Sequence, residues 1–145
     1  MILADKRDYR NGYRKHYCTY LELKQGNISV RSRRLLLTYC VECGLKYLLL
    51  DSWHESNPEK IIQNKRDKRN KIITSHNLEN ILKELGQAGV FVFPKMTTVH
   101  KDTVIAENFH ELCRYGIRIE KRDEEKEKQY ERELQKVAKW IGEEV

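Results

Sequence analysis

The segment that most constrains the fold of this chain spans residues 33–50. It is apolar around almost its whole circumference, yet Thr38, Glu42 and Lys46 recur at intervals of four residues. Residues four apart lie on one stripe of a helix, and a helix that is apolar everywhere else is normally the buried centre of a helical domain. Glu42 and Lys46 either pair with each other at the rim of the core or join other polar groups in a pocket. The pattern leaves both interpretations open.

Helical periodicity recurs on both sides of this segment. The spacing of apolar residues predicts helices over residues 4–24, 29–53, 75–86, 102–115 and 123–142, with Ser75 as a favourable N-cap. Residues 54–73, which include Pro58 and a basic run, are expected to form a loop with a short helical turn. Residues 90–93 are extended but too short to build a sheet. The predicted fold is all-α: a single domain of residues 1–145 that forms an antiparallel bundle of about five helices.

Composition narrows the class of protein. The chain has 145 residues and a formal net charge of +6, which suits one folded domain and favours an anionic partner, with nucleic acid the first candidate. No membrane partner is expected, because Glu42 and Lys46 interrupt the apolar run. No secretory signal is visible at the charged N-terminus, and the four cysteines have no regular spacing. Both observations predict reduced thiols and a cytoplasmic protein.

A basic run over residues 64–71, NKRDKRNK, contains one acidic residue, Asp67. Such a cluster is an electrostatic footprint for a phosphate backbone, or else a solvated flexible loop. The candidate nucleic-acid-binding residues are Lys65, Arg66, Lys68 and Arg69. A second basic group, residues 31–34, stands at the start of the predicted central helix.

Metal and cofactor sites are not predicted. Cys40 and Cys43 form a CxxC motif inside a helix, whereas a structural zinc site requires a second ligand pair held on a turn. Cys18 and Cys113 occupy apolar-face positions and are expected to be buried thiols. The glutamate-rich last helix is expected to present a solvated face with i,i+4 ion pairs.

Three segments together resemble the HEPN-domain proteins, small prokaryotic helical bundles. VECGLKYLLL (residues 41–50) resembles the "ECALK" helix of that family, and SHNLENILKELG (75–86) resembles its histidine-led third helix. FHELCRYGIRIE (109–120) is similar to the arginine-tyrosine-glycine segment that opens its last part. The order and spacing of the three agree over roughly residues 1–142.

This resemblance implies an RNA-directed protein of a prokaryotic defence or toxin–antitoxin system. Many members of the family are metal-independent RNases, and others are non-catalytic modules that bind RNA, dimerise or dock on a larger protein. A homodimer and an antitoxin or larger defence protein are therefore the implied protein partners. Active members carry an arginine, a polar residue and, four to six residues after the arginine, a histidine. The matching arginine is Arg114, but Arg118, Ile119 and Glu120 stand where the histidine would fall.

The candidate catalytic residues are Arg114, His76 and Glu42, one from each segment that carries the resemblance. Packed helices would let these side chains converge, either to bind a phosphate or simply to satisfy one another. Without a histidine after Arg114, we expect weak or no RNase activity from the isolated chain. If activity exists, His76 is the best single candidate, and His110 is another if it lies close to Arg114.

Overall fold

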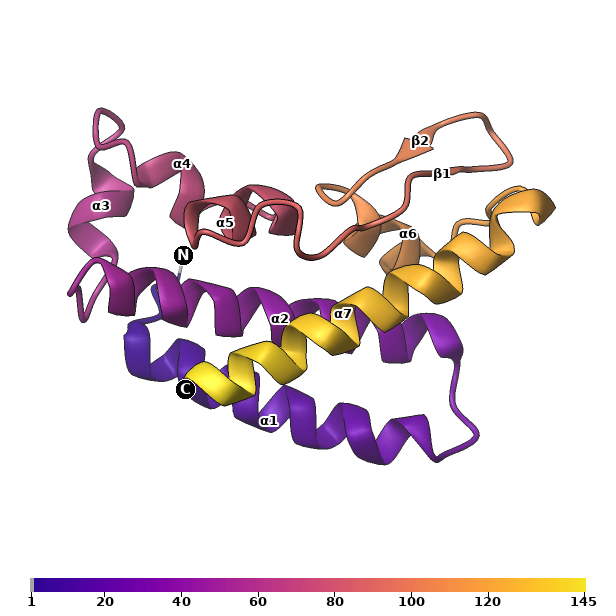
Figure 1. Ribbon diagram of the computed structural model, residues 1–145, viewed down its shortest axis with the longest axis horizontal. Helices are drawn as coiled ribbons and strands as arrows, with labels where there is room; N and C mark the ends of the chain where they lie inside the picture. Colours follow the sequence, from indigo (N-terminus) through magenta and orange to yellow (C-terminus); the bar gives the residue numbers. More distant parts are fainter. Residues whose placement is uncertain (1) are drawn as a thin grey trace.

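The computed structural model describes residues 2–145 and is built almost entirely from helices (Figure 1). A two-stranded antiparallel ribbon pairs Met96 with Val104 and Thr97 with Thr103. The predicted all-α class is confirmed. In chain order the elements are α1 (Lys6–Lys24), α2 (Val30–Ser52), α3 (Glu59–Gln63), α4 (Asn70–Ile73), α5 (Leu78–Glu84), β1 (Met96–Thr97), β2 (Thr103–Val104), α6 (Phe109–Tyr115), the 3-10 turn η1 (Lys121–Asp123) and α7 (Glu124–Glu144).

Helix α2 is the centre of the molecule, as its all-round apolar pattern predicts. It packs against α1, α5, α6 and α7, and 11 of its 23 residues are buried. Figure 1 shows α1 running beside α2, with α7 crossing both so that the C-terminus lies near the start of α1. Within residues 2–145, no helix combines the length and the apolarity that crossing a bilayer would require.

A glycine marks the point where the three long helices meet. A Cβ atom on Gly44 would lie 2.8 Å from side-chain carbons of both Ile141 in α7 and Tyr13 in α1. The Tyr13 hydroxyl also donates a hydrogen bond of 2.7 Å to the Ala138 carbonyl. Only a residue without a side chain allows the helices to approach this closely.

Several predicted boundaries were wrong for local reasons. Asn77, not Ser75, caps the third predicted helix, because its side chain accepts hydrogen bonds from the Glu79 and Asn80 N–H groups. The helix predicted over 102–115 begins only at Phe109, since residues 103–104 pair with β1. The Asn108 side chain holds the intervening turn by accepting from the Ile105 N–H at 2.8 Å. Residues 54–73 contain two short helices, α3 and α4, which raises the helix count above five.

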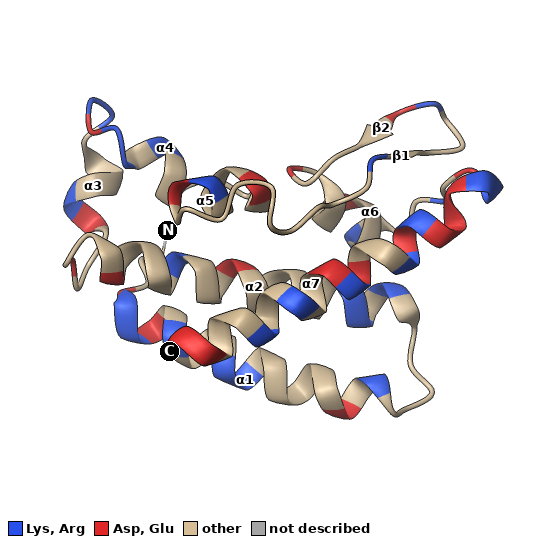
Figure 2. Ribbon diagram, viewed as in Figure 1, with Lys and Arg blue, Asp and Glu red and all other residues tan. Residues whose placement is uncertain are grey.

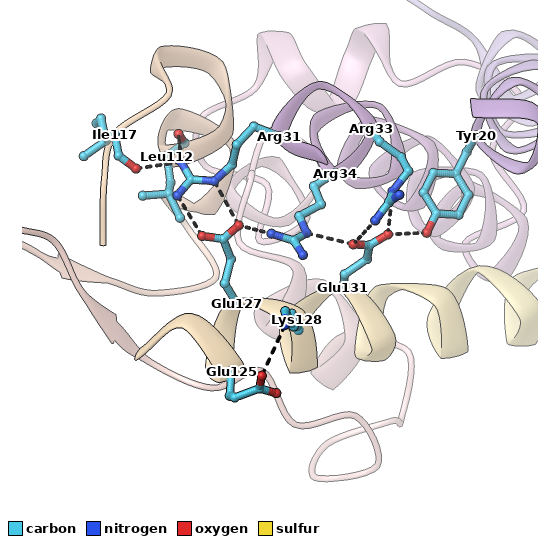
Figure 3. A network of polar contacts seen from close by, with 10 residues as sticks. All are labelled: Tyr20, Arg31, Arg33, Arg34, Leu112, Ile117, Glu125, Glu127, Lys128 and Glu131. Atoms are coloured by element: carbon cyan, nitrogen blue, oxygen red, sulfur yellow. Dashed lines mark hydrogen bonds and ion pairs between the residues drawn. The ribbon is translucent and has the colours of Figure 1, made fainter. Parts of the chain in front are cut away.

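A buried network of ion pairs joins the first turns of α2 to α7 (Figure 3). Glu131 accepts hydrogen bonds from Arg33 at 3.0 and 2.9 Å and from Arg34 Nε at 2.7 Å. Glu127 accepts from Arg31 at 2.9 and 2.7 Å and also from Arg34. Each arginine therefore has a carboxylate partner, which meets the requirement for placing charge inside a protein.

The basic group at the start of α2, Arg31, Arg33 and Arg34, forms ion pairs with Glu127 and Glu131 of α7. The network also corrects one expectation about α7. The glutamates of α7 are only partly solvated: Glu127, Glu131 and Glu133 are buried, whereas Glu124, Glu125, Glu143 and Glu144 are exposed. Arg31 also donates to the Leu112 and Ile117 carbonyls at 3.0 and 2.6 Å, so the network fixes the end of α6 against α2 and α7.

Candidate functional site

Glu42, on the polar stripe of α2, contacts His76. Glu42 Oε1 lies 2.8 Å from Nδ1 of His76, just before α5, and Glu42 Oε2 lies 3.7 Å from Nζ of the buried Lys46. Glu42 therefore pairs with Lys46 along its own helix, as one interpretation of the stripe predicted, and it also contacts the exposed His76 of a neighbouring segment. Thr38 does not take part, since its hydroxyl donates to the Arg34 carbonyl within α2.

A second imidazole stands beside the first. The ring centroids of His76 and His110, the second residue of α6, are 5.2 Å apart. Burial lowers the pKa of His110, and the nearby positive charges of His76 and Arg114 lower it further. His110 is therefore held neutral at neutral pH, the form in which an imidazole can accept a proton.

Arg114 lies one helical turn after His110, on the same face of α6. Its guanidinium is exposed and donates a hydrogen bond of 2.5 Å to the Tyr39 hydroxyl of α2. This bond raises the pKa of Arg114, so the group stays charged. We refer to Glu42, His76, His110 and Arg114 as the histidine cluster.

The cluster combines the three residues that the family resemblance pointed to, Glu42, His76 and Arg114, with His110, which was named only as a substitute. Glu42 and His76 are in contact, as expected, and His110 places a second imidazole beside that of His76. The signal for His110 was available: a histidine four residues before an arginine on a helix faces the same side. Tyr39 was missed, although it stands three residues before Glu42 in α2. Hydrogen bonding to Lys101 lowers the pKa of the Glu120 carboxyl, which makes Glu120 a weaker base than an ordinary glutamate.

The basic loop is only partly free. Arg69 Nη2 lies 2.7 Å from Asp67 Oδ2, and its guanidinium lies 5.6 Å from the Trp53 ring centroid. The same hydrogen bonds lower the pKa of Asp67 to about 2. Arg69 therefore shapes the loop. Within residues 2–145, Lys65, Arg66 and Lys68 are exposed and form no ion pair.

The cysteines show no arrangement for catalysis. Burial raises the pKa of Cys43 to about 11 and that of Cys113 to about 12, and Cys40 is fully buried. Cys18 is exposed, contrary to the expectation of a buried thiol. In the described part of the chain, no group of three or more His, Cys, Asp and Glu side chains is placed to hold a metal ion.

The chain matches no family model, no curated protein and no solved structure. Function is therefore inferred from the chemistry of the histidine cluster and from the distribution of charge around it.

Proposed function

We propose that this chain is an HEPN-like, RNA-directed protein of a prokaryotic defence or toxin–antitoxin system, and that the histidine cluster cleaves RNA without a metal ion. The observation that carries the proposal is the 5.2 Å separation of the His76 and His110 rings, with Arg114 one turn along α6. The sequence favoured weak or no activity because no histidine follows Arg114. His110 removes that objection, since it presents an imidazole on the same helix face as the arginine.

The proposed reaction uses the RNA's own 2′-hydroxyl as the nucleophile. Neutral His110 accepts the 2′ proton while the oxygen attacks the adjacent phosphorus, and the bond to the 5′-oxygen breaks. His76 gives a proton to that leaving oxygen, so the products are a 2′,3′-cyclic phosphate and a 5′-hydroxyl. Glu42 orients the His76 ring by accepting a hydrogen bond from its Nδ1–H group, which leaves Nε2 to exchange protons. Arg114 neutralises the charge that develops on the phosphate oxygens.

Cleavage is tested with a labelled RNA in the presence of a chelator. We expect His76→Ala and His110→Ala each to reduce the rate by about 100-fold or more, the usual contribution of a general acid or base. His100→Ala is the matched control, because His100 is an exposed histidine in the β1–β2 connection. An all-deoxy strand of the same sequence should remain intact, since it lacks the nucleophile. Equal cleavage by the His110→Ala variant would refute the assignment.

A second candidate function is a non-catalytic HEPN module that dimerises or docks on an antitoxin or larger defence protein. It is favoured by the hydrogen bonds that the polar groups of the cluster already form within the protein. Arg114 donates to the Tyr39 hydroxyl, and Glu42 is hydrogen-bonded to His76. Such pairing can simply pin α2, α5 and α6 together. Wild-type protein that binds RNA or a partner but yields no cyclic phosphate would select this alternative.

The family resemblance also leads us to propose a two-fold homodimer, in which two copies of Arg114 approach one groove. Light scattering at micromolar concentration measures the mass directly. A species of 17.4 kDa alone would contradict the proposal.

A further inference from the structure

A groove with a strongly basic lining lies where α7 crosses the hairpin of α1 and α2. Two adjoining hollows share Lys24, Arg132 and Gln135 and together follow the space between α1 and α7. We call this surface the α1–α7 groove. It is separate from the histidine cluster, whose residues lie between α2, α5 and α6, and from the loop of residues 64–71. Figure 2 shows bands of Lys and Arg recurring along α7 where it passes over α1 and α2.

The positive charge of this groove is only partly neutralised by the described residues. Within residues 2–145, Lys24, Arg132 and Lys139 form no ion pair, although all three line the groove. Lys128 and Lys136 have partners only on their own helix, three residues earlier. The one carboxylate in the lining, Glu131, is already committed to the arginines of α2. An external anion is therefore the natural complement of this surface.

The arrangement of the cations is linear. Lys128, Arg132 and Lys136 recur every four residues, so they form one stripe with a rise of about 6 Å between neighbours. Lys139 extends this stripe. On the opposite side of the groove, α1 contributes the ring of Tyr17 and the half-exposed Leu21. A row of cations facing an aromatic ring matches a chain of phosphates whose bases can stack, whereas a single small anion would use only part of it.

We propose that the α1–α7 groove binds a single-stranded nucleic acid, with its phosphates along α7 and a base against Tyr17. This binding does not depend on cleavage, because none of the groove residues belongs to the histidine cluster. An RNA held here would be retained by the protein whether or not it is cut. The proposal therefore stands or falls separately from the proposed RNase activity.

The test is a binding titration with a fluorescent 2′-O-methyl RNA dodecamer, which cannot be cleaved through its 2′-oxygen. The variant K24Q/R132Q/K139Q removes three cations without breaking an ion pair in the described residues. We expect the Kd to rise at least about tenfold at moderate salt. The slope of log Kd against log salt should fall by about 2, because each lost phosphate contact on a single strand contributes about 0.7.

A matched control changes the net charge by the same amount elsewhere on the surface. Lys60, Lys83 and Lys95 are exposed and lie outside the groove, so K60Q/K83Q/K95Q should shift the Kd by less than about threefold. Equal weakening of the two variants would overturn the proposal, since only net charge would then matter. A glutamate-rich helical peptide that displaces the dodecamer more effectively than unlabelled RNA would also overturn it, because the groove would then fit an acidic protein helix.

Discussion

Replacing Glu131, a buried carboxylate of α7, with alanine is expected to destabilise the fold. In the native protein this carboxylate accepts hydrogen bonds from Arg33, Arg34 and the Tyr20 hydroxyl, the last at 2.5 Å. Its side chain is only 7% exposed, and that of Arg34 only 8%. Truncation therefore removes a partner from groups that water can scarcely reach.

The expected loss of unfolding free energy depends on the arginines that lose Glu131 as a partner. Removing one partner of a buried ion pair costs about 3–5 kcal/mol, chiefly because the remaining charge stays buried without its counterpart. Arg34 retains Glu127, and Arg33, at 19% exposed, can be partly rehydrated. The expected loss therefore lies near the lower limit, about 3 kcal/mol of unfolding free energy.

Acid should weaken the contribution of Glu131 to the unfolding free energy. Burial raises the pKa of Glu131, but hydrogen bonds from Arg33, Tyr20 and Arg34 outweigh it, so the net pKa lies below the ordinary value of 4.5. A carboxyl whose pKa is lower in the folded than in the unfolded state stabilises the fold above the unfolded pKa. That stabilisation is lost as the pH falls from about 4.5 through the folded pKa. Glu131→Gln should therefore show a flatter loss of stability with acid than the wild type.

Urea unfolding followed by far-UV circular dichroism measures these differences. Glu125→Ala is the matched control: it removes the same charge from the same helix, but Glu125 is 76% exposed and only contacts Lys128 at 3.3 Å. Its cost should be below about 0.5 kcal/mol. A loss below about 1 kcal/mol for Glu131→Ala, or one equal to that of Glu125→Ala, would refute the view that this network is buried and paired.

Three further outcomes are expected. Gly44→Ala should lower the unfolding free energy by about 1–3 kcal/mol in the same urea assay, because a Cβ would press into Ile141 and Tyr13; no loss of stability would mean that the helices can separate at little cost. In an NMR titration the pKa of His110 should lie below 6.5. Arg114→Gln should raise this pKa only partly, because burial, the largest cause of the lowered pKa, remains. An unchanged pKa in the variant would contradict the proximity of the two side chains. A thiol reagent added to the native protein should modify Cys18 rapidly and the other three cysteines slowly, because Cys18 is the exposed one. Mass spectrometry identifies the modified cysteine. Rapid labelling of Cys40 would contradict the packing of α1 on α2.

The local patterns of the chain were enough to predict its class and its centre. An apolar surface around the whole of residues 33–50 must be covered whatever the topology, so α2 was predictably buried. The long helices at both ends follow from their own periodicity in the same way. The short elements were less predictable, because Asn77 and Asn108 set the starts of α5 and of the turn before α6 through contacts two to three residues away. Propensity alone does not resolve such contacts.

Some features of the candidate site were also predictable from spacing along one helix, and others depended on how the helices pack. Spacing on one helix indicated that Glu42 faces the same side as Lys46, whereas His110 was a candidate only if it lay close to Arg114. Nothing in the spacing showed that His76 would meet Glu42, 34 residues away, or that its ring would stand beside that of His110. Those contacts depend on how α5 and α6 are laid against α2.

The charges illustrate most clearly what the sequence by itself determined and what only the tertiary structure decided. The sequence determined how many charges the chain carries and on which helix faces they fall, since both are properties of neighbouring residues. It could not distinguish a solvated glutamate of α7 from a buried one, or a free arginine of α2 from a paired one. Arg34 and Glu131 are 97 residues apart, and a charge enters the interior only where the fold brings an opposite charge to it. The tertiary structure alone therefore decided that the arginines of α2 are paired with α7, while Lys24, Arg132 and Lys139 of the α1–α7 groove form no ion pair within residues 2–145.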